Sequence, residues 1–256
     1  MEPDEPKGTV TLNPEQFLNI FIDCAARRLH DMRVVLRALD EPTYVSLANS
    51  QRPGAIIDLR VSETVKTDGV AERQTRDCFS GIFEDFMSFV DKLIAIQIIK
   101  TEGGIFITRP LIGEENIQQY IEQYVTEKIR LIEQNNSLTV PAKIAKFPIT
   151  DDVKKIISAF NQVRIAIRHH QGIAKQDIAL TFHVLKVVIG GKDIASLPAM
   201  AEAGDNISIR ADVRIKNFKK GEVIALNEED VEEMIFSLQT VVSPSLIALS
   251  LSNHGL

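Results

Sequence analysis

Apolar residues recur at intervals of three and four along most of the chain, which predicts a mainly α-helical protein. The clearest runs cover residues 14–39, about 70–100, 113–136, 151 to about 170, and 227–242. Capping residues mark several starts, because Asn13 precedes a proline, Thr150 precedes two aspartates and Asn227 precedes three acidic residues. We therefore expect five helices.

Strand character is confined to shorter segments. Residues 206–217 alternate strictly, with an apolar row on one side and polar residues on the other; the row is Ile207, Ile209, Ala211, Val213 and Ile215. A Lys-Lys-Gly turn follows, which predicts residues 222–226 as the hairpin partner of that strand. Residues 179–191 are compatible with helix or strand, and residues 55–61 and 104–112 have weak strand character.

These elements predict a mainly α fold: one helical domain over 14–242 with a small antiparallel β insertion at about 176–226. A loose N-terminal tail (1–13) and a C-terminal tail (243–256) flank it. An α+β arrangement of two subdomains that meet near residue 140 is the alternative. The aromatic row at helical spacing in the second helix, Phe79, Phe83, Phe86 and Phe89, is expected in the core.

Composition places the chain among ordinary globular proteins, with 45% hydrophobic and 25% charged residues. No apolar stretch approaches the roughly 20 residues that span a bilayer, and the acidic, proline-containing start does not resemble a signal peptide. Cys24 and Cys78 both fall within apolar helical patterns, so we expect buried, reduced thiols and a cytoplasmic location. No Cys/His set has the spacing of metal ligands, and no metal or cofactor is expected.

Charge is unevenly distributed. The formal net charge is −6, which argues against a general nucleic-acid or membrane binder. Between residues 141 and 175, however, the sequence contains seven basic residues and only two acidic ones, Asp151 and Asp152, which gives a local charge of +5. The seven basic residues are Lys143, Lys146, Lys154, Lys155, Arg164, Arg168 and Lys175. A solvated helix face explains such a cluster as well as an RNA-binding surface does.

The segment "VRIAIRHHQGIAK" (163–175) lies within this basic region. Arg164 is followed after four residues by His169, and a second histidine, His170, comes next. The preceding apolar stripe predicts that the segment forms the end of a helix, and Gly172 is placed to take the left-handed conformation that ends it. The other histidines, His30, His183 and His254, stand alone and are interpreted as core, surface or tail residues.

This arrangement resembles the HEPN family (higher eukaryote and prokaryote nucleotide-binding domains), helical bundles with an arginine followed four to six residues later by histidine. Arg164 matches the arginine, His169 the histidine and Gly172 the glycine of the turn that follows. The resemblance covers residues 141–242, because the β insertion and the capped last helix follow in the same order. The residue after Arg164 is Ile165, where active members often carry asparagine.

The resemblance implies metal-independent RNA cleavage at a cleft between two copies of the chain, in a toxin or a phage-defence effector. An arginine fork holds a phosphate bidentately, and a histidine transfers protons near neutral pH. We expect Arg164 and His169 to be catalytic, with Arg168 and His170 in support. The lysines at 143, 146, 154, 155 and 175 are then expected to bind the RNA backbone.

Two alternatives remain open at this point. The cations could simply decorate a helix C-terminus, with Arg164 and Arg168 solvated or paired to acids of the last helix such as Glu228 or Glu232. A non-catalytic HEPN-like dimer could instead serve as a scaffold that binds RNA, a nucleotide or a protein partner such as an antitoxin, and Ile165 favours this interpretation.

Overall fold

The computed structural model describes residues 13–40, 67–101, 114–135, 138–189, 192–194 and 207–251. These ranges are mostly helical and contain one small antiparallel sheet. The elements are α1 (Pro14–Asp40), α3 (Thr67–Thr101), α4 (Glu114–Gln134), α5 (Val140–Ile144), α6 (Asp151–His169), β1 (Ile178–Ile189), β2 (Lys192–Ile194), β3 (Ile207–Phe218), α7 (Glu228–Ser237), the π-helical turn η1 (Leu238–Val242) and α8 (Ser243–Leu251).

The predicted capping residues act as expected. Asn13 accepts a hydrogen bond from the Glu15 backbone N–H at 2.9 Å, and Thr150 accepts one from Val153 N–H at 3.5 Å. Asn227 forms a reciprocal capping box with the residue at the third helical position, Asp230. Each contact satisfies an N–H that a helix start would otherwise leave unpaired, and this explains why the helices begin where the sequence predicts.

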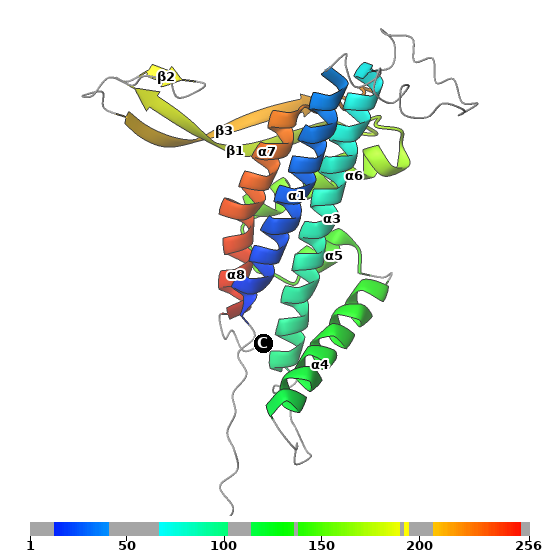
Figure 1. Cartoon of the computed structure of the whole chain (residues 1–256), viewed down its shortest axis with the longest axis vertical. Coiled ribbons are helices and arrows are strands. Elements are labelled where there is room, and N and C mark those ends of the chain that lie inside the picture. The colour runs from blue at the N-terminus through cyan, green and yellow to red at the C-terminus, as the bar shows by residue number, and fades with distance from the viewer. Residues whose placement is uncertain are drawn as a thin grey trace, which may run out of the picture.

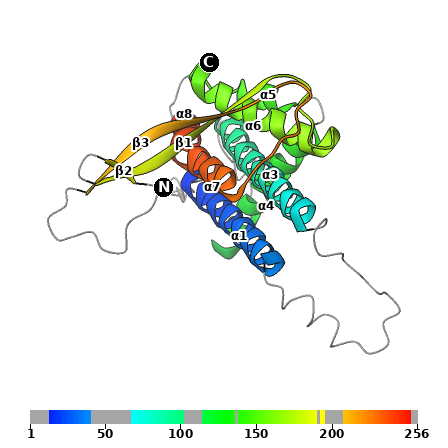
Figure 2. The same cartoon turned by 90° about the horizontal axis from the view of Figure 1, so that it is seen from above.

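The helices form two layers. Helices α1, α3 and α7 lie side by side, and α6 packs behind α3 (Figure 1). The long β1–β3 ribbon packs on α6 and α7, and seen from above it lies on the side of the bundle away from α1 (Figure 2). Its far half, with β2, extends beyond the helices (Figure 1). Helix α4 packs against the C-terminal half of α3.

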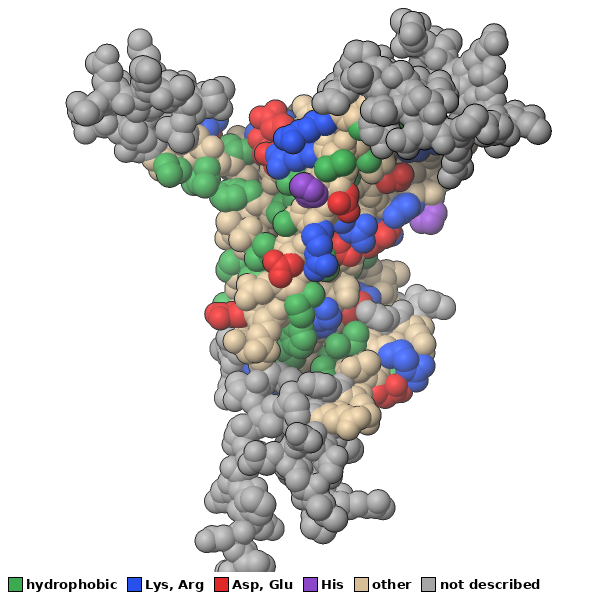
Figure 3. Space-filling model, in the orientation of Figure 1, with side chains coloured by type: hydrophobic (Ala, Val, Ile, Leu, Met, Phe, Trp, Pro, Cys, Tyr) green, Lys and Arg blue, Asp and Glu red, His purple; other side chains and the backbone are tan. Residues whose placement is uncertain are grey.

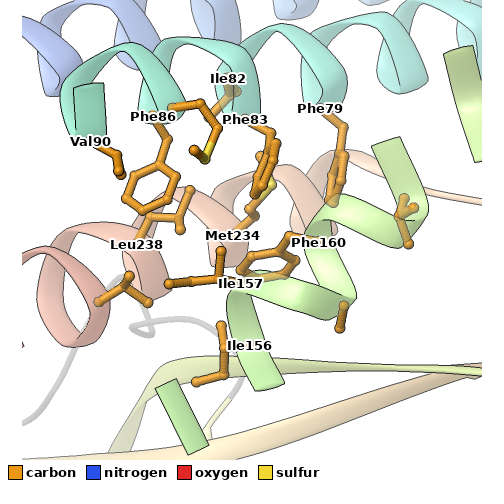
Figure 4. Packing of buried hydrophobic residues seen from close by; sticks show 14 of the residues in the cluster. Phe79, Ile82, Phe83, Phe86, Val90, Ile156, Ile157, Phe160, Met234 and Leu238 are labelled. Atoms are coloured by element: carbon orange, nitrogen blue, oxygen red, sulfur yellow. The ribbon is translucent and has the colours of Figure 1, made fainter. Parts of the chain in front are cut away.

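The core lies between α3, α6 and the α7–η1 segment (Figure 4). The phenylalanine row of α3 is at most 1% exposed, so its predicted place in the core is confirmed. Phe79 contacts Phe160 of α6 edge to face, with ring centroids 6.0 Å apart. The row contributes about 1.5–3 kcal/mol for each buried ring, and it packs α3 against both neighbours, because Phe86 and Phe89 contact Phe21 of α1.

The sheet corrects one prediction. Its strand order is β2-β1-β3, and β3 pairs with β1 in a register that runs from Ile178 opposite Phe218 to Ile189 opposite Ile207. The segment 222–226, predicted as the hairpin partner of β3, makes only an isolated bridge from Val223 to Ile173. The reason is that this segment is bonded to the loop after α6.

The orientation of β3 could not be predicted from its alternation. Its polar row faces the helices, where Arg214 and Lys216 bond to the fully buried Asp230 of α7 at 2.7 and 2.6 Å. Its apolar row faces outward: Ile209 is 68% and Ile215 59% exposed. Alternation shows which residues share a face of a strand and leaves open which face is covered.

The C-terminal helix is longer than predicted. After η1, which ends at Val242, it continues as α8 from Ser243 to Leu251, where a tail was expected. Leu246 is fully buried in the core, which explains why this part packs as helix. The possible strands at 55–61 and 104–112 and the tail residues 1–12 and 252–256 lie outside the described residues.

Two further expectations concern membranes and cysteines. None of the helices in the described ranges is long and apolar enough to cross a membrane. Both cysteines are free, as expected, but only Cys78 is buried, whereas Cys24 is partly exposed. Burial raises the pKa of the Cys78 thiol to about 11, which keeps it protonated and unreactive at neutral pH.

Candidate functional site

The candidate site is the C-terminal end of α6 and the turn that follows it. Gln171 and Gly172 both have positive φ, 54° and 77°, so the left-handed end predicted at Gly172 is confirmed and includes one more residue. Gly172 N–H donates to Ala166 at 2.9 Å, and its carbonyl accepts from Ile224 N–H at 2.7 Å. These bonds fix the turn after α6 to the segment after β3.

Arg164 and Arg168 lie one turn apart on α6 and share a carboxylate of α3. Arg168 donates to both oxygens of Glu84 at 3.2 Å, and its Nε also donates to the buried hydroxyl of Ser80 at 2.8 Å. The Arg164 guanidinium lies 3.8 Å from Glu84, and its Nε donates to Asn161 at 3.4 Å. The two arginines are therefore held side by side, with a net charge of +1 for the three groups.

The acids of the last helix have a different partner. Glu228 and Glu232, suggested as partners of Arg164 and Arg168, both pair with Arg33 of α1. Arg164 and Arg168 do not meet these acids because α6 presents its arginines to α3, while the start of α7 lies beside α1 (Figure 1).

The two histidines lie at the helix end without fixed partners in the described part of the chain. His169 is exposed and His170 partly exposed, and neither imidazole bonds to another described residue. His169 is still helical, so the five-residue separation places it about 140° around the helix axis from Arg164. Within one chain, the predicted Arg–His pair is not brought together.

A cavity of about 210 Å³ opens beside Arg164, between α3, α5 and α6. Its lining combines charged, polar and apolar side chains: Phe83, Glu84, Met87, Ser88, Asp91, Val140 and Arg164. A second cavity of about 290 Å³ lies on the other side of Val140 and is lined in part by Lys154 and Asn161. Asn161, which lines this second cavity, accepts a hydrogen bond from Arg164, which lines the first.

Most of the predicted basic surface is paired with acids. Lys143 forms a 2.7 Å ion pair with the nearly buried Asp91 of α3, so it is not available at the surface. Lys154 and Lys155 pair with Asp151 and Asp152 one turn earlier on α6. Lys146 and Lys175 remain exposed. Figure 3 likewise shows basic and acidic side chains intermixed on the face that it presents.

Sequence reasoning missed the contribution of α3 to this site. Arg76, Ser80 and Glu84 follow at intervals of four on one face of that helix, and all three meet α6 or the turn after it. The Arg76 guanidinium lies against Gly172, 2.7 Å from the place where a Cβ would be. Its Nη2 pairs with Glu72 at 2.8 Å, and its buried Nε has no hydrogen-bond partner among the described residues. The i, i+4, i+8 spacing was the only available signal.

No group of three or more His, Cys, Asp or Glu residues in the described ranges is arranged to hold a metal ion. Comparison with family models, with curated proteins and with solved structures gives no match for this chain.

Proposed function

We propose that two copies of this chain form an endoribonuclease site of the HEPN type, in which Arg164 of one copy binds the scissile phosphate and His169 of the other transfers protons. The observation that carries the proposal is the arginine arrangement: Glu84 holds Arg164 and Arg168 together, and Arg164 lines an open cavity. A preorganised guanidinium pair stabilises charge that grows on phosphate oxygens.

The proposal includes a second copy because Arg164 and His169 of the same chain point in different directions from α6 and do not meet. The exposed imidazole of His169 is free to face the arginine of a neighbour across a two-fold axis, and both sites are then equivalent. Lys146 and Lys175, which have no acidic partner among the described residues, would add to RNA backbone attraction at such a cleft. A cytoplasmic location and a role as a toxin or phage-defence effector belong to the same proposal.

The proposed reaction needs no external nucleophile. The ribose 2′-oxygen attacks the adjacent phosphorus while one histidine accepts its proton. The bond between phosphorus and the 5′-oxygen breaks, and that oxygen receives a proton from a second imidazole, the role that we assign to the neighbouring His170. The products are a 2′,3′-cyclic phosphate and a 5′-hydroxyl end, so atoms and charge balance without water or a metal ion.

The proposal is tested with purified full-length chain and end-labelled RNA in EDTA. We expect cleavage by the wild type, cyclic-phosphate ends on the products, and a loss of at least about 100-fold for Arg164→Ala and for His169→Ala. Arg27→Ala and His30→Ala are matched controls, because both residues are exposed on α1. Cleavage at equal rates by all five proteins would refute the proposal.

A second candidate function is a non-catalytic RNA-binding scaffold of the same type. The observation that favours it is that Glu84 already neutralises part of the charge of both arginines, and Ile165 offers no polar group next to Arg164. In this case RNA binds in a salt-dependent manner and remains intact. Fluorescence anisotropy with labelled RNA, followed by recovery of the uncut strand, separates the two functions.

A further inference from the structure

The outer edge of β3 carries backbone hydrogen-bonding groups that pair with no other strand in the described part of the chain. His183 lies opposite Val213, yet its N–H donates to Ser237 of α7 at 2.8 Å, on the side away from β3. The pair is therefore of the non-hydrogen-bonded kind, and Val213 N–H must point away from β1. It does so and donates to the side chain of Asp212 at 2.8 Å.

By the same alternation, the backbone groups of Ile209, Ala211, Val213 and Ile215 all point to the outer edge. In the described chain the sheet ends at β3. The side chains of the same four residues form the exposed apolar row, and Val213 is 49% exposed. Figure 3 shows hydrophobic side chains gathered along the projecting ribbon. An edge strand with an exposed aliphatic row is a surface on which another strand can add.

We infer that this edge pairs with β3 of a second copy of the chain, antiparallel, with Ala211 on the two-fold axis. In that register Val213 lies opposite Ile209 of the other copy, so the two aliphatic rows pack against each other. On the opposite face Asp212 lies opposite Arg210 of the other copy, twice by symmetry. The pairing combines backbone bonds, apolar contact and opposite charges.

The charged side chains of β3 favour a second copy of the chain as the partner strand, and they favour the register centred on Ala211. Moving the axis from Ala211 to Arg210 places that arginine opposite itself, and moving it to Asp212 places two aspartates together. Asp212 already bonds to Lys186 at 2.6 Å and lies 3.5 Å from Arg210 of its own chain. When the two strands pair, the Asp212 carboxylate gives up its hydrogen bond with Val213 N–H and binds Arg210 of the other copy instead. A strand of unrelated sequence would not reproduce this match.

The interface is separate from the proposed RNA site. From Ala211, β3 extends seven more residues to Phe218, roughly 23 Å along an extended strand, before the turn at Gly221 that lies beside the end of α6. The two α6 ends therefore stay far apart, and the inference does not depend on the RNA proposal. Because two short strands bury less than a standard interface, we expect a dissociation constant of about 1–100 µM.

Cysteine cross-linking tests the register directly. In Ala211→Cys the two thiols face each other across the axis, with Cα atoms about 5.5 Å apart, within the range that a disulfide bridges. We expect it to form a covalent dimer at least about tenfold faster than Val223→Cys, a control at a residue that is 54% exposed outside the strands. Equal rates would overturn the inference.

Charge reversal provides a second, independent test by analytical ultracentrifugation. Arg210→Asp should raise the dissociation constant about tenfold or more, and the double variant with Asp212→Arg should restore it, because every opposed pair then regains opposite signs. Circular dichroism confirms that each variant is folded. A dimer that both tests leave unchanged would refute strand pairing and would leave the RNA proposal standing. A monomer at several hundred micromolar would contradict both, because the RNA site also needs two copies.

Discussion

The buried carboxylate of Asp230 offers the sharpest test of how the ribbon is fixed to the helices. It is fully buried and accepts hydrogen bonds from Arg214, Lys216 and the Asn227 backbone N–H at 2.7, 2.6 and 2.8 Å. In Asp230→Asn the side chain keeps its size and loses its charge, and one of its acceptor oxygens becomes a donor. Two cations then face an uncharged group at the junction of β3 and α7.

The expected loss of stability follows from these contacts. Breaking a buried ion pair from one side costs about 3–5 kcal/mol. The side chains of Arg214 and Lys216 are 32% and 27% exposed, so solvent recovers part of that energy, and Arg214 keeps Glu233 as a partner. We therefore expect a decrease of about 3 kcal/mol in the free energy of unfolding, or roughly 6–12 °C in Tm.

Urea unfolding followed by circular dichroism at 222 nm measures this decrease. Glu229→Gln is the matched control, because Glu229 is exposed in the same first turn of α7 and its loss should cost no more than about 0.5 kcal/mol. A difference between Asp230→Asn and Glu229→Gln smaller than about 1 kcal/mol would refute the reasoning, provided that the urea dependence of both is unchanged.

Three further predictions concern α3, the turn after α6 and β3. Glu84→Gln should release both arginines, tighten RNA binding and steepen its salt dependence by about 0.7 for each additional phosphate that is neutralised; Asp85→Asn, the control in filter binding, should not. Gly172→Ala should cost about 1–2 kcal/mol, since a Cβ would meet a guanidinium and φ is positive, whereas Gly69→Ala, with open space inside a helix, should be neutral or stabilising in the same urea assay. Lys186, bonded to Asp212, lowers the pKa of that carboxyl to about 2; the stability that it contributes is present above the ordinary value of about 3.9 and is lost as pH falls through about 2. An NMR titration midpoint of Asp212 near 3.9 would contradict this.

The sequence predicted well where the signals are local. The caps at Asn13, Thr150 and Asn227 and the apolar stripes fix where helices begin and which faces are buried, and both kinds of signal span only a few residues. Gly172 was also predictable, because a helix that ends in a left-handed turn favours glycine there. Interactions within one turn of helix can thus be predicted without the fold.

Prediction failed where distant segments compete. The segment 222–226 follows a tight turn, yet Ile224 N–H bonds to Gly172 and Gly221 N–H to Ala174, so the loop after α6 holds it away from β3. No short sequence pattern around 222–226 indicates that this segment bonds to the loop after α6 and not to β3. The outward apolar row of β3 was unpredictable for the same reason, since Asp230 on α7 decides which face of the strand is inside.

In the candidate site, too, the local features were predictable from the sequence and the contacts between distant segments were not. Arg164, Arg168 and His169 could be selected from their spacing, but Glu84, the partner of the two arginines, lies 80 residues before Arg164 on another helix. Pairing distant charges requires knowing which helix faces which, and the choice of Glu228 or Glu232 was wrong because α3 covers the arginine face of α6. The local charge of +5 predicted from the sequence is reduced by acids that only the fold brings close.

The proposed two-subunit site is tested most directly by mixing two inactive variants. Arg164→Ala and His169→Ala, each inactive alone, should recover activity when mixed, because each mixed dimer contains one site with both residues intact. Equal mixing should yield about a quarter of the wild-type rate of RNA cleavage, with cyclic-phosphate ends. Cleavage by the wild type with no recovery in the mixture would contradict a site shared between subunits.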